Sequence, residues 1–295
     1  MKNYKFTFLI ILGILFTGCS LEEEPPFLAN ENVYSSASNA TSALFGVYEA
    51  MVQYEYYGNE FLFLTNVNSG LMVSRRTGNN NSNSYNSTLS SLKPSSGLVA
   101  IENSWTGIYQ TIGRTNEVIN SATASENPST PDELIINDVI GQAYFVRAFN
   151  YFNLVRLWGE VPLRVTPTTT ETVHLAKSPI EAIYAQIIID VKRAQQLMNG
   201  AVASGTPKPQ AADMLLSKVY MTLATASSAI QDSSLNYWQL AYDEAIKVYG
   251  AYSLHDSYDN LFLGTNGNNT AESIFELQSV VGASLDHTRA FTPNW

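Results

Sequence analysis

Tyrosine, arginine and asparagine side chains gather in one stretch of the sequence, where they could bind a ligand. Residues 77–85 are a run of Asn, Ser and Gly that ends in a tyrosine, and further tyrosines and an Arg-Arg pair precede it. Flat rings with polar tips cover the apolar C–H faces of a carbohydrate or peptide, while amides and guanidinium groups bond its polar atoms. The candidate ligand-binding residues are therefore Tyr54, Tyr56, Tyr57, Arg75, Arg76, Asn79 and Tyr85.

The same residues have a structural alternative. Helical patterning is lost between Tyr54 and Ser96, which predicts a long loop, and a loop of that length in a compact domain is usually functional or disordered. The tyrosines could instead form a helix end that packs on the core. Arg147 and Arg156 lie within an aromatic helical segment, where a structural role in ion pairs or against apolar surface is expected.

Patterns for catalysis are not found in the sequence. There is no G-x-S-x-G elbow, P-loop or Rossmann glycine pattern, and the three histidines lack the i, i+4 spacing of a zinc-binding helix. The acidic pair Asp132-Glu133 falls where a helix should begin, and Asp243-Glu244 falls on a polar helix face. We expect neither a catalytic site nor a metal or cofactor, although the two carboxylates of a glycosidase could lie far apart in the chain.

The only cysteine, Cys19, follows a short apolar segment. Lys2 and Lys5 precede the apolar residues 6–16, a run too short for the ~20 residues of a membrane-spanning helix. The segment ends in Leu-Phe-Thr-Gly-Cys, which resembles a bacterial lipobox, so we expect residues 1–18 to be a signal peptide and Cys19 to carry lipid. Two or three acyl chains give stable membrane anchoring. The alternative is a secreted protein whose signal peptide contains a cysteine.

An acidic run follows the cysteine. Ser20-Leu21-Glu22-Glu23-Glu24 is followed by two prolines, which exclude a continuous helix. We expect residues 19–38 to tether residues 39–295 to the membrane. Acidic residues behind a lipidated cysteine also accompany export to the outer face of some outer membranes, so the chain is expected to face the cell exterior.

The composition limits the class of partner. In the 295 residues, 16 Lys and Arg stand against 26 Asp and Glu, which gives a net charge of −10 and a pI near 4.8. Such a chain is a poor ligand for phosphate backbones, so nucleic acid is not an expected partner. Charged residues make up only 14% of the chain, and Asn, Ser and Thr supply much of its polarity.

Apolar residues at steps of three and four predict a mainly α fold with long loops and minor β elements. Helices are expected near residues 39–51, 101–119, 140–158, 180–198, 209–223 and 238–249. Ser178 and Glu181 are predicted to cap the fourth of these, and Ser273–Leu277 to form a short strand. The spacing of Trp238, Ala241 and Ala245 resembles the first helix of a tetratricopeptide unit, and that stripe is expected to be buried.

Residues 147–163, RAFNYFNLVRLWGEVPL, resemble the signature segment of the SusD/RagB family. Further blocks match that family in the same order along the chain, at residues 43–48, 105–109, 116–119, 218–220, 241–247, 252–254 and 272–276. The resemblance implies a tetratricopeptide-like scaffold in an outer-membrane lipoprotein that is not an enzyme. It further implies that the protein caps a SusC-like TonB-dependent transporter and binds a glycan, or in some members a peptide. Members of the family are considerably longer, so we expect the counterpart of their C-terminal part to be missing from this sequence.

Three functions follow from these observations. The leading one is a non-catalytic glycan-binding lipoprotein that delivers its ligand to the SusC-like transporter. The second is a lipoprotein whose helical repeats hold protein or peptide partners. The third is a surface glycosidase, which requires two carboxylates at catalytic separation.

Overall fold

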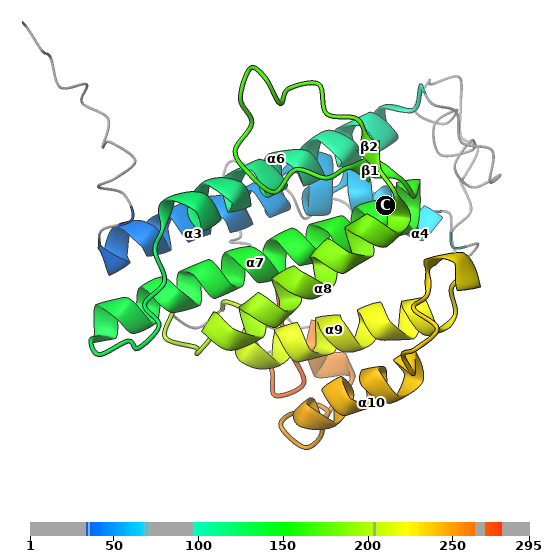
Figure 1. Ribbon diagram of the computed structural model, residues 1–295. Helices are drawn as coiled ribbons and strands as arrows, with labels where there is room; N and C mark the ends of the chain where they lie inside the picture. Colours follow the sequence, from blue (N-terminus) through cyan, green and yellow to red (C-terminus); the bar gives the residue numbers. More distant parts are fainter. Residues whose placement is uncertain are drawn as a thin grey trace, which may run out of the picture.

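The computed structural model describes residues 34, 36–67, 69, 97–202, 205–262 and 269–278. Within them the fold is mainly α, with helices that pack as successive antiparallel neighbours from α7 to α10 (Figure 1). This confirms the predicted fold class. Cys19, the predicted signal peptide, and Arg75, Arg76, Asn79 and Tyr85 lie outside the described residues.

Each helix begins and ends as follows. The α-helices are α3 (Ala37–Val52), α4 (Glu60–Val67), α6 (Val99–Ser121), α7 (Pro131–Trp158), α8 (Ile180–Leu197), α9 (Pro209–Ala224) and α10 (Tyr237–Val248). A π-helical turn, η1 (Tyr54–Gly58), and two 3-10 turns, η2 (Ser228–Ile230) and η3 (Asp259–Phe262), complete the helical set. Strands β1 (Val161–Pro162) and β2 (Lys177–Ser178) pair antiparallel, with Val161 opposite Ser178.

Helix α7 is the centre of the core and packs against α3, α6 and α8. It begins at Pro131 because Thr130 and Glu133 form a capping box: the Thr130 hydroxyl accepts from the Glu133 N–H at 3.2 Å, and the Glu133 carboxylate accepts from the Thr130 N–H at 3.0 Å. The helix ends at Gly159, whose φ of 71° lies in the left-handed region. Its buried residues lie on every side, as expected for a helix that neighbours surround.

The predicted cap of α8 is wrong. Its N-cap residue is Pro179, and no side chain caps the helix. Ser178 is paired with Val161 in the β1–β2 ladder instead, and the helix starts at Ile180. A strand pairing immediately before the helix therefore replaces the capping box.

The long loop predicted from Tyr54 is interrupted by helical structure. η1 and α4 occupy residues 54–58 and 60–67, because Tyr56, Phe61 and Leu64 turn inward and are buried. The predicted strand at Ser273–Leu277 is also wrong. These residues have no ladder partner among the described residues, and Phe275 packs edge-on against Phe145 with ring centroids 5.5 Å apart.

Helices α9 and α10 pair as predicted, but the stripe on α10 is only partly buried. Tyr237, Ala241 and Val248 face α9 and are buried, whereas Trp238 is 57% exposed and Tyr242 60% exposed. Since α10 is the last α-helix described and lies at the edge of the stack (Figure 1), it has a helical neighbour on one side only. Half of the predicted stripe therefore meets solvent.

Candidate functional site

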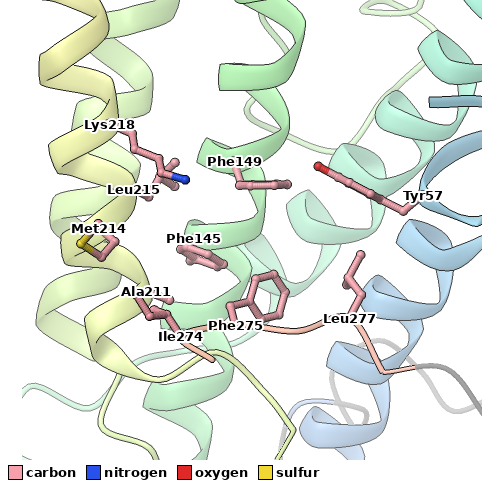
Figure 2. A pocket seen from close by; sticks show the side chains of 10 residues that line it. All are labelled: Tyr57, Phe145, Phe149, Ala211, Met214, Leu215, Lys218, Ile274, Phe275 and Leu277. Atoms are coloured by element: carbon pink, nitrogen blue, oxygen red, sulfur yellow. The ribbon is translucent and has the colours of Figure 1, made fainter. Parts of the chain in front are cut away.

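A groove runs along α7, with α9 on one side and η1 on the other (Figure 2). Its larger part is a cavity of about 440 Å³. Helix α7 supplies two phenylalanines, α9 supplies Lys218 and apolar neighbours, and the segment around Phe275 closes one end (Figure 2). The lining residues are Tyr57, Phe145, Phe149, Ala211, Met214, Leu215, Lys218, Ile274, Phe275 and Leu277. We call this cavity and its extension the α7 groove.

The extension is a second hollow of about 350 Å³ that shares Tyr57, Phe149, Leu215 and Lys218 with the first. It follows α7 toward its C-terminal end, and its other lining residues are Phe61, Thr65, Phe152, Asn153, Arg156 and Leu157. Because Thr65 lies in the last turn of α4, the groove reaches the point where the described chain stops before the candidate residues 75–85.

The end of α4 and the start of α6 are held together beside this point. Leu64 and Leu98 are buried in a small apolar cluster, with Phe63, Ile101 and Trp158 packed around them. The segment between α4 and α6 therefore leaves and re-enters the described fold at one place. That place adjoins the C-terminal part of α7.

Aromatic rings form a wall of the groove. Tyr57 and Phe149 are stacked, with centroids 6.1 Å apart and planes inclined by 29°. Phe145 and Phe149 repeat the arrangement one turn along α7, at 6.2 Å and 27°. Such a row of ring faces provides an apolar platform for the C–H face of a sugar ring.

At the end of the α7 groove where Arg156 lies, the side-chain amide of Asn153 holds the polar groups in place. Asn153 donates from Nδ2 to the hydroxyls of Tyr56, at 2.9 Å, and Tyr57, at 3.1 Å. Its Oδ1 accepts from Arg156 Nη2 at 2.7 Å, and the guanidinium carbon lies 4.0 Å from the centre of the Phe152 ring. Burial raises the pKa of Tyr57 to about 12, so its hydroxyl keeps its proton at neutral pH. Desolvation lowers the pKa of Arg156 from its ordinary value, which still leaves the guanidinium charged.

The charges of the groove are positive. Within the described part of the chain, neither Lys218 nor Arg156 pairs with a carboxylate, and no lining residue of either cavity is Asp or Glu. The described residues also contain no cluster of His, Cys, Asp and Glu that could hold a metal ion. The groove therefore offers stacking surface and hydrogen-bond donors, and its described lining supplies no carboxylate pair for glycoside cleavage.

The structure separates the three predicted tyrosines. Tyr56 is fully buried and behaves as the core residue of the structural alternative, Tyr54 is 47% exposed on η1, and Tyr57 lines the α7 groove. Phe145, Phe149 and Lys218 were missed. The sequence does contain a pattern that indicates the two phenylalanines. Phe145, Phe149 and Phe152 follow i, i+4, i+7 spacing and form a second apolar stripe beside the predicted core stripe of the same helix.

Known proteins resemble this chain in sequence and fold. Residues 21–221 match the SusD-like family model described as starch-binding and associating with the outer membrane. The curated SusD-like protein P2 of Formosa agariphila is 29% identical over 238 residues, which cover 79% of this chain and 46% of that protein. The chain thus spans about half the length of the curated relatives at this level of similarity.

Solved structures share the fold. A SusD superfamily protein from Bacteroides vulgatus aligns with a TM-score of 0.66 at 24% identity, over 84% of this chain and 51% of that one. A laminarin-binding SusD-like protein aligns with a TM-score of 0.62 at 23% identity, over 81% and 50%. A structure with a xylogluco-oligosaccharide aligns with a TM-score of 0.64 at 22% identity, over 81% and 46%.

Proposed function

The chain belongs to the SusD-like family, and from this premise we propose that it is a non-catalytic glycan-binding protein of the cell surface. The observation that carries the proposal is the aromatic wall of the α7 groove, flanked by Lys218 and Arg156. The ligands named for two similar structures, laminarin and a xylogluco-oligosaccharide, support a glucan as the first ligand to test. Tyr54 and Tyr57 remain the candidate contacts within the described residues, with Arg75, Arg76, Asn79 and Tyr85 beyond them.

The proposal extends to location and partner. Residues 1–18 would be removed as a signal peptide, Cys19 would carry the lipid, residues 19–38 would act as the tether, and 39–295 would form the helical domain. No helix within the described residues is long and apolar enough to cross a bilayer. A lipid anchor would hold the protein at the outer face of the outer membrane, where it would deliver glycan to a SusC-like TonB-dependent transporter.

Substitution Cys19→Ala is expected to release the protein from membranes, because it removes the thiol that would carry the acyl chains. The measurement is an immunoblot of washed membrane and soluble fractions from cells that express the full-length chain. Ser20→Ala is the matched control and should stay in the membrane fraction. Retention of the Cys19 variant in washed membranes would rule out the anchor.

Glycan binding is tested by affinity gels that contain laminarin or xyloglucan, run with the lipid-free full-length chain. We expect retardation in at least one gel and about tenfold weaker binding for Lys218→Ala, which loses a charged donor at the junction of the two hollows. Tyr57→Ala should weaken binding by a similar or larger factor, because it removes part of the stacking wall.

Two control variants lie away from the groove. Lys192→Ala on the exposed face of α8 and Tyr249→Ala, 86% exposed after α10, should migrate as the unmodified protein does. A reducing-sugar assay on each bound glycan separates the functions. Binding without product supports the proposal, and release of sugar supports a glycosidase. If Lys218→Ala and Lys192→Ala bind the glycan equally well, the α7 groove is not the glycan-binding site.

A scaffold for protein or peptide partners is the second candidate, and the outer face of α10 favours it. Trp238, Tyr242 and Ile246 are each at least 46% exposed there. Exposed aromatic residues on one helix face are typical of protein contact sites. Absence of any glycan binding, together with a partner cross-linked to α10, would favour the scaffold.

A further inference from the structure

A separate cavity lies between α6 and the segment that follows α7. Its volume is about 290 Å³, and it shares no lining residue with the α7 groove. We call it the α6 cavity. Its lining residues are Trp105, Tyr109, Ile112, Gly113, Asn116, Pro162, Arg164 and Thr168.

Side chains from α6 and α7 fix the backbone of the cavity wall. The Tyr109 hydroxyl donates to the Pro162 carbonyl at 2.7 Å, and Asn116 Nδ2 donates to the carbonyls of Arg164 and Thr166, both at 3.1 Å. Arg147 donates to the Val165 carbonyl at 2.9 Å. Because the wall is held by these bonds before any ligand arrives, a ligand would not have to order it.

Arg164 supplies a positive charge to the cavity. Its guanidinium donates to the carbonyls of Thr172, at 2.7 Å, and Val173, at 2.6 Å, and more weakly to the Thr168 hydroxyl at 3.4 Å. All three acceptors are neutral, and no carboxylate of the described residues pairs with Arg164. The charge is thus held in place without a counter-ion, and the guanidinium has N–H donors left for an anionic ligand.

Trp105 supplies a ring and an indole N–H. Its ring lies 4.9 Å from that of Tyr109, at 45°, and meets the Trp158 ring edge-on at 5.5 Å. Gly113, two turns further along α6, leaves its part of the same wall open, because a Cβ built there would meet no atom within 4 Å. A flat ring, an indole donor and an unneutralised guanidinium together match a sugar that carries a carboxylate.

We propose that the α6 cavity binds a single uronate unit of an acidic saccharide. Its volume lies at the lower limit for small-molecule sites, which suits one sugar ring and excludes a chain of several. The aromatic pair would cover one face of the ring, and Arg164 would bond its carboxylate. This site goes beyond the proposed function and does not depend on the α7 groove.

The test uses glucuronate and glucose with the lipid-free full-length chain, labelled with ¹⁵N. The four tryptophans give separate indole N–H signals, and Trp105→Phe identifies the one from the cavity. We expect glucuronate to shift that signal saturably, and glucose to bind roughly tenfold or more weakly because it lacks the charge. An unmoved Trp105 signal, or equal binding of the two sugars, would overturn the proposal.

Two substitutions locate the binding. Gly113→Leu should fill the cavity and abolish the shift, whereas Gly46→Leu on α3, where a Cβ also meets no atom within 4 Å, should leave it unchanged. Arg164→Gln should weaken glucuronate binding about tenfold and reduce the preference over glucose. A shift that survives in Gly113→Leu would also overturn the proposal. Lys218→Ala should leave the shift unchanged, so loss of the groove function and loss of this site are distinguishable.

Discussion

Substitution Asp190→Ala is expected to lower the free energy of unfolding by about 3–5 kcal/mol, because it leaves the Arg147 guanidinium charged and without its carboxylate inside the protein. The pair is bidentate: Arg147 donates to the two Asp190 oxygens from Nη2 at 2.7 Å and from Nε at 2.8 Å. Both side chains are at most 4% exposed. Arginine cannot lose its proton to escape the cost.

The pair also joins four parts of the fold. Arg147 lies on α7 and Asp190 on α8, and Arg147 Nη1 donates at 2.9 Å to Asn116 on α6. The same nitrogen bonds the Val165 carbonyl, so the wall of the α6 cavity rests on this arginine. The structural role expected for Arg147 from the sequence is thus confirmed.

Urea unfolding followed by circular dichroism measures the effect. Glu160→Ala is the comparison, since it removes one partner of the exposed Lys177–Glu160 pair and should cost less than about 1 kcal/mol. The double variant Arg147→Met/Asp190→Leu should recover much of the loss, because no buried charge is left. Equal losses for Asp190→Ala and Glu160→Ala would show that the buried pair does not hold the helices together.

Helix positions could be predicted because they depend on local patterning. The stripe on α9 is buried and those on α3 and α8 mostly are, as their spacing requires. On α6 only Ile108 and Ile112 of the predicted stripe are buried, and Trp105 and Tyr109 are half-buried.

Where a helix ends and which of its faces is exposed depend on the neighbouring elements. The apolar spacing within one helix does not reveal those neighbours. Ser178 has the spacing of a cap but is paired with Val161. Trp238 has the spacing of a core residue, but it is 57% exposed and none of the described helices covers it.

The candidate site was predictable only in part for the same reason. Tyr57 could be identified by residue type near an asparagine-rich stretch, while Tyr56, with the same neighbours, is buried. Phe149 and Lys218 lie far apart in the sequence and line one cavity only because α9, which packs on α8, also contacts α7. Likewise, Trp105 and Arg164 form one cavity because the segment after α7 folds back over α6.

Substitution Asp138→Ala is expected to lower the free energy of unfolding by about 3–4 kcal/mol. The reason differs from that given for Asp190→Ala, because Asp138 accepts backbone N–H bonds and has no charged partner in the described part of the chain. The Asp138 side chain is fully buried and accepts backbone N–H bonds from Asn199 at 2.9 Å, Gly200 at 3.2 Å and Val202 at 2.8 Å. These N–H groups follow the end of α8, where the chain turns toward α9. The Val202 bond is buried, and a buried donor left without an acceptor costs roughly 1–3 kcal/mol. The Asn199 and Gly200 bonds are part-buried, so water would offset part of their loss.

Asp138→Asn tests whether both carboxylate oxygens are needed. One amide position is a donor and cannot accept, so either the Val202 bond or the Asn199 and Gly200 bonds must be lost. We expect the Asp138→Asn variant to regain no more than about half of the free energy of unfolding that Asp138→Ala loses.

Asp243→Ala is the control for both substitutions, because among the described residues Asp243 bonds only the exposed Gln239 side chain. This variant should lower the free energy of unfolding by less than about 0.5 kcal/mol. Chemical denaturation gives the free energies, and amide hydrogen exchange at residues 199–202 gives the location. Faster exchange there in Asp138→Ala, with slow exchange kept in α7, is the expected pattern. If those amides stay protected without the carboxylate, the turn between α8 and α9 is held by the packing of Met198 and Val202 instead.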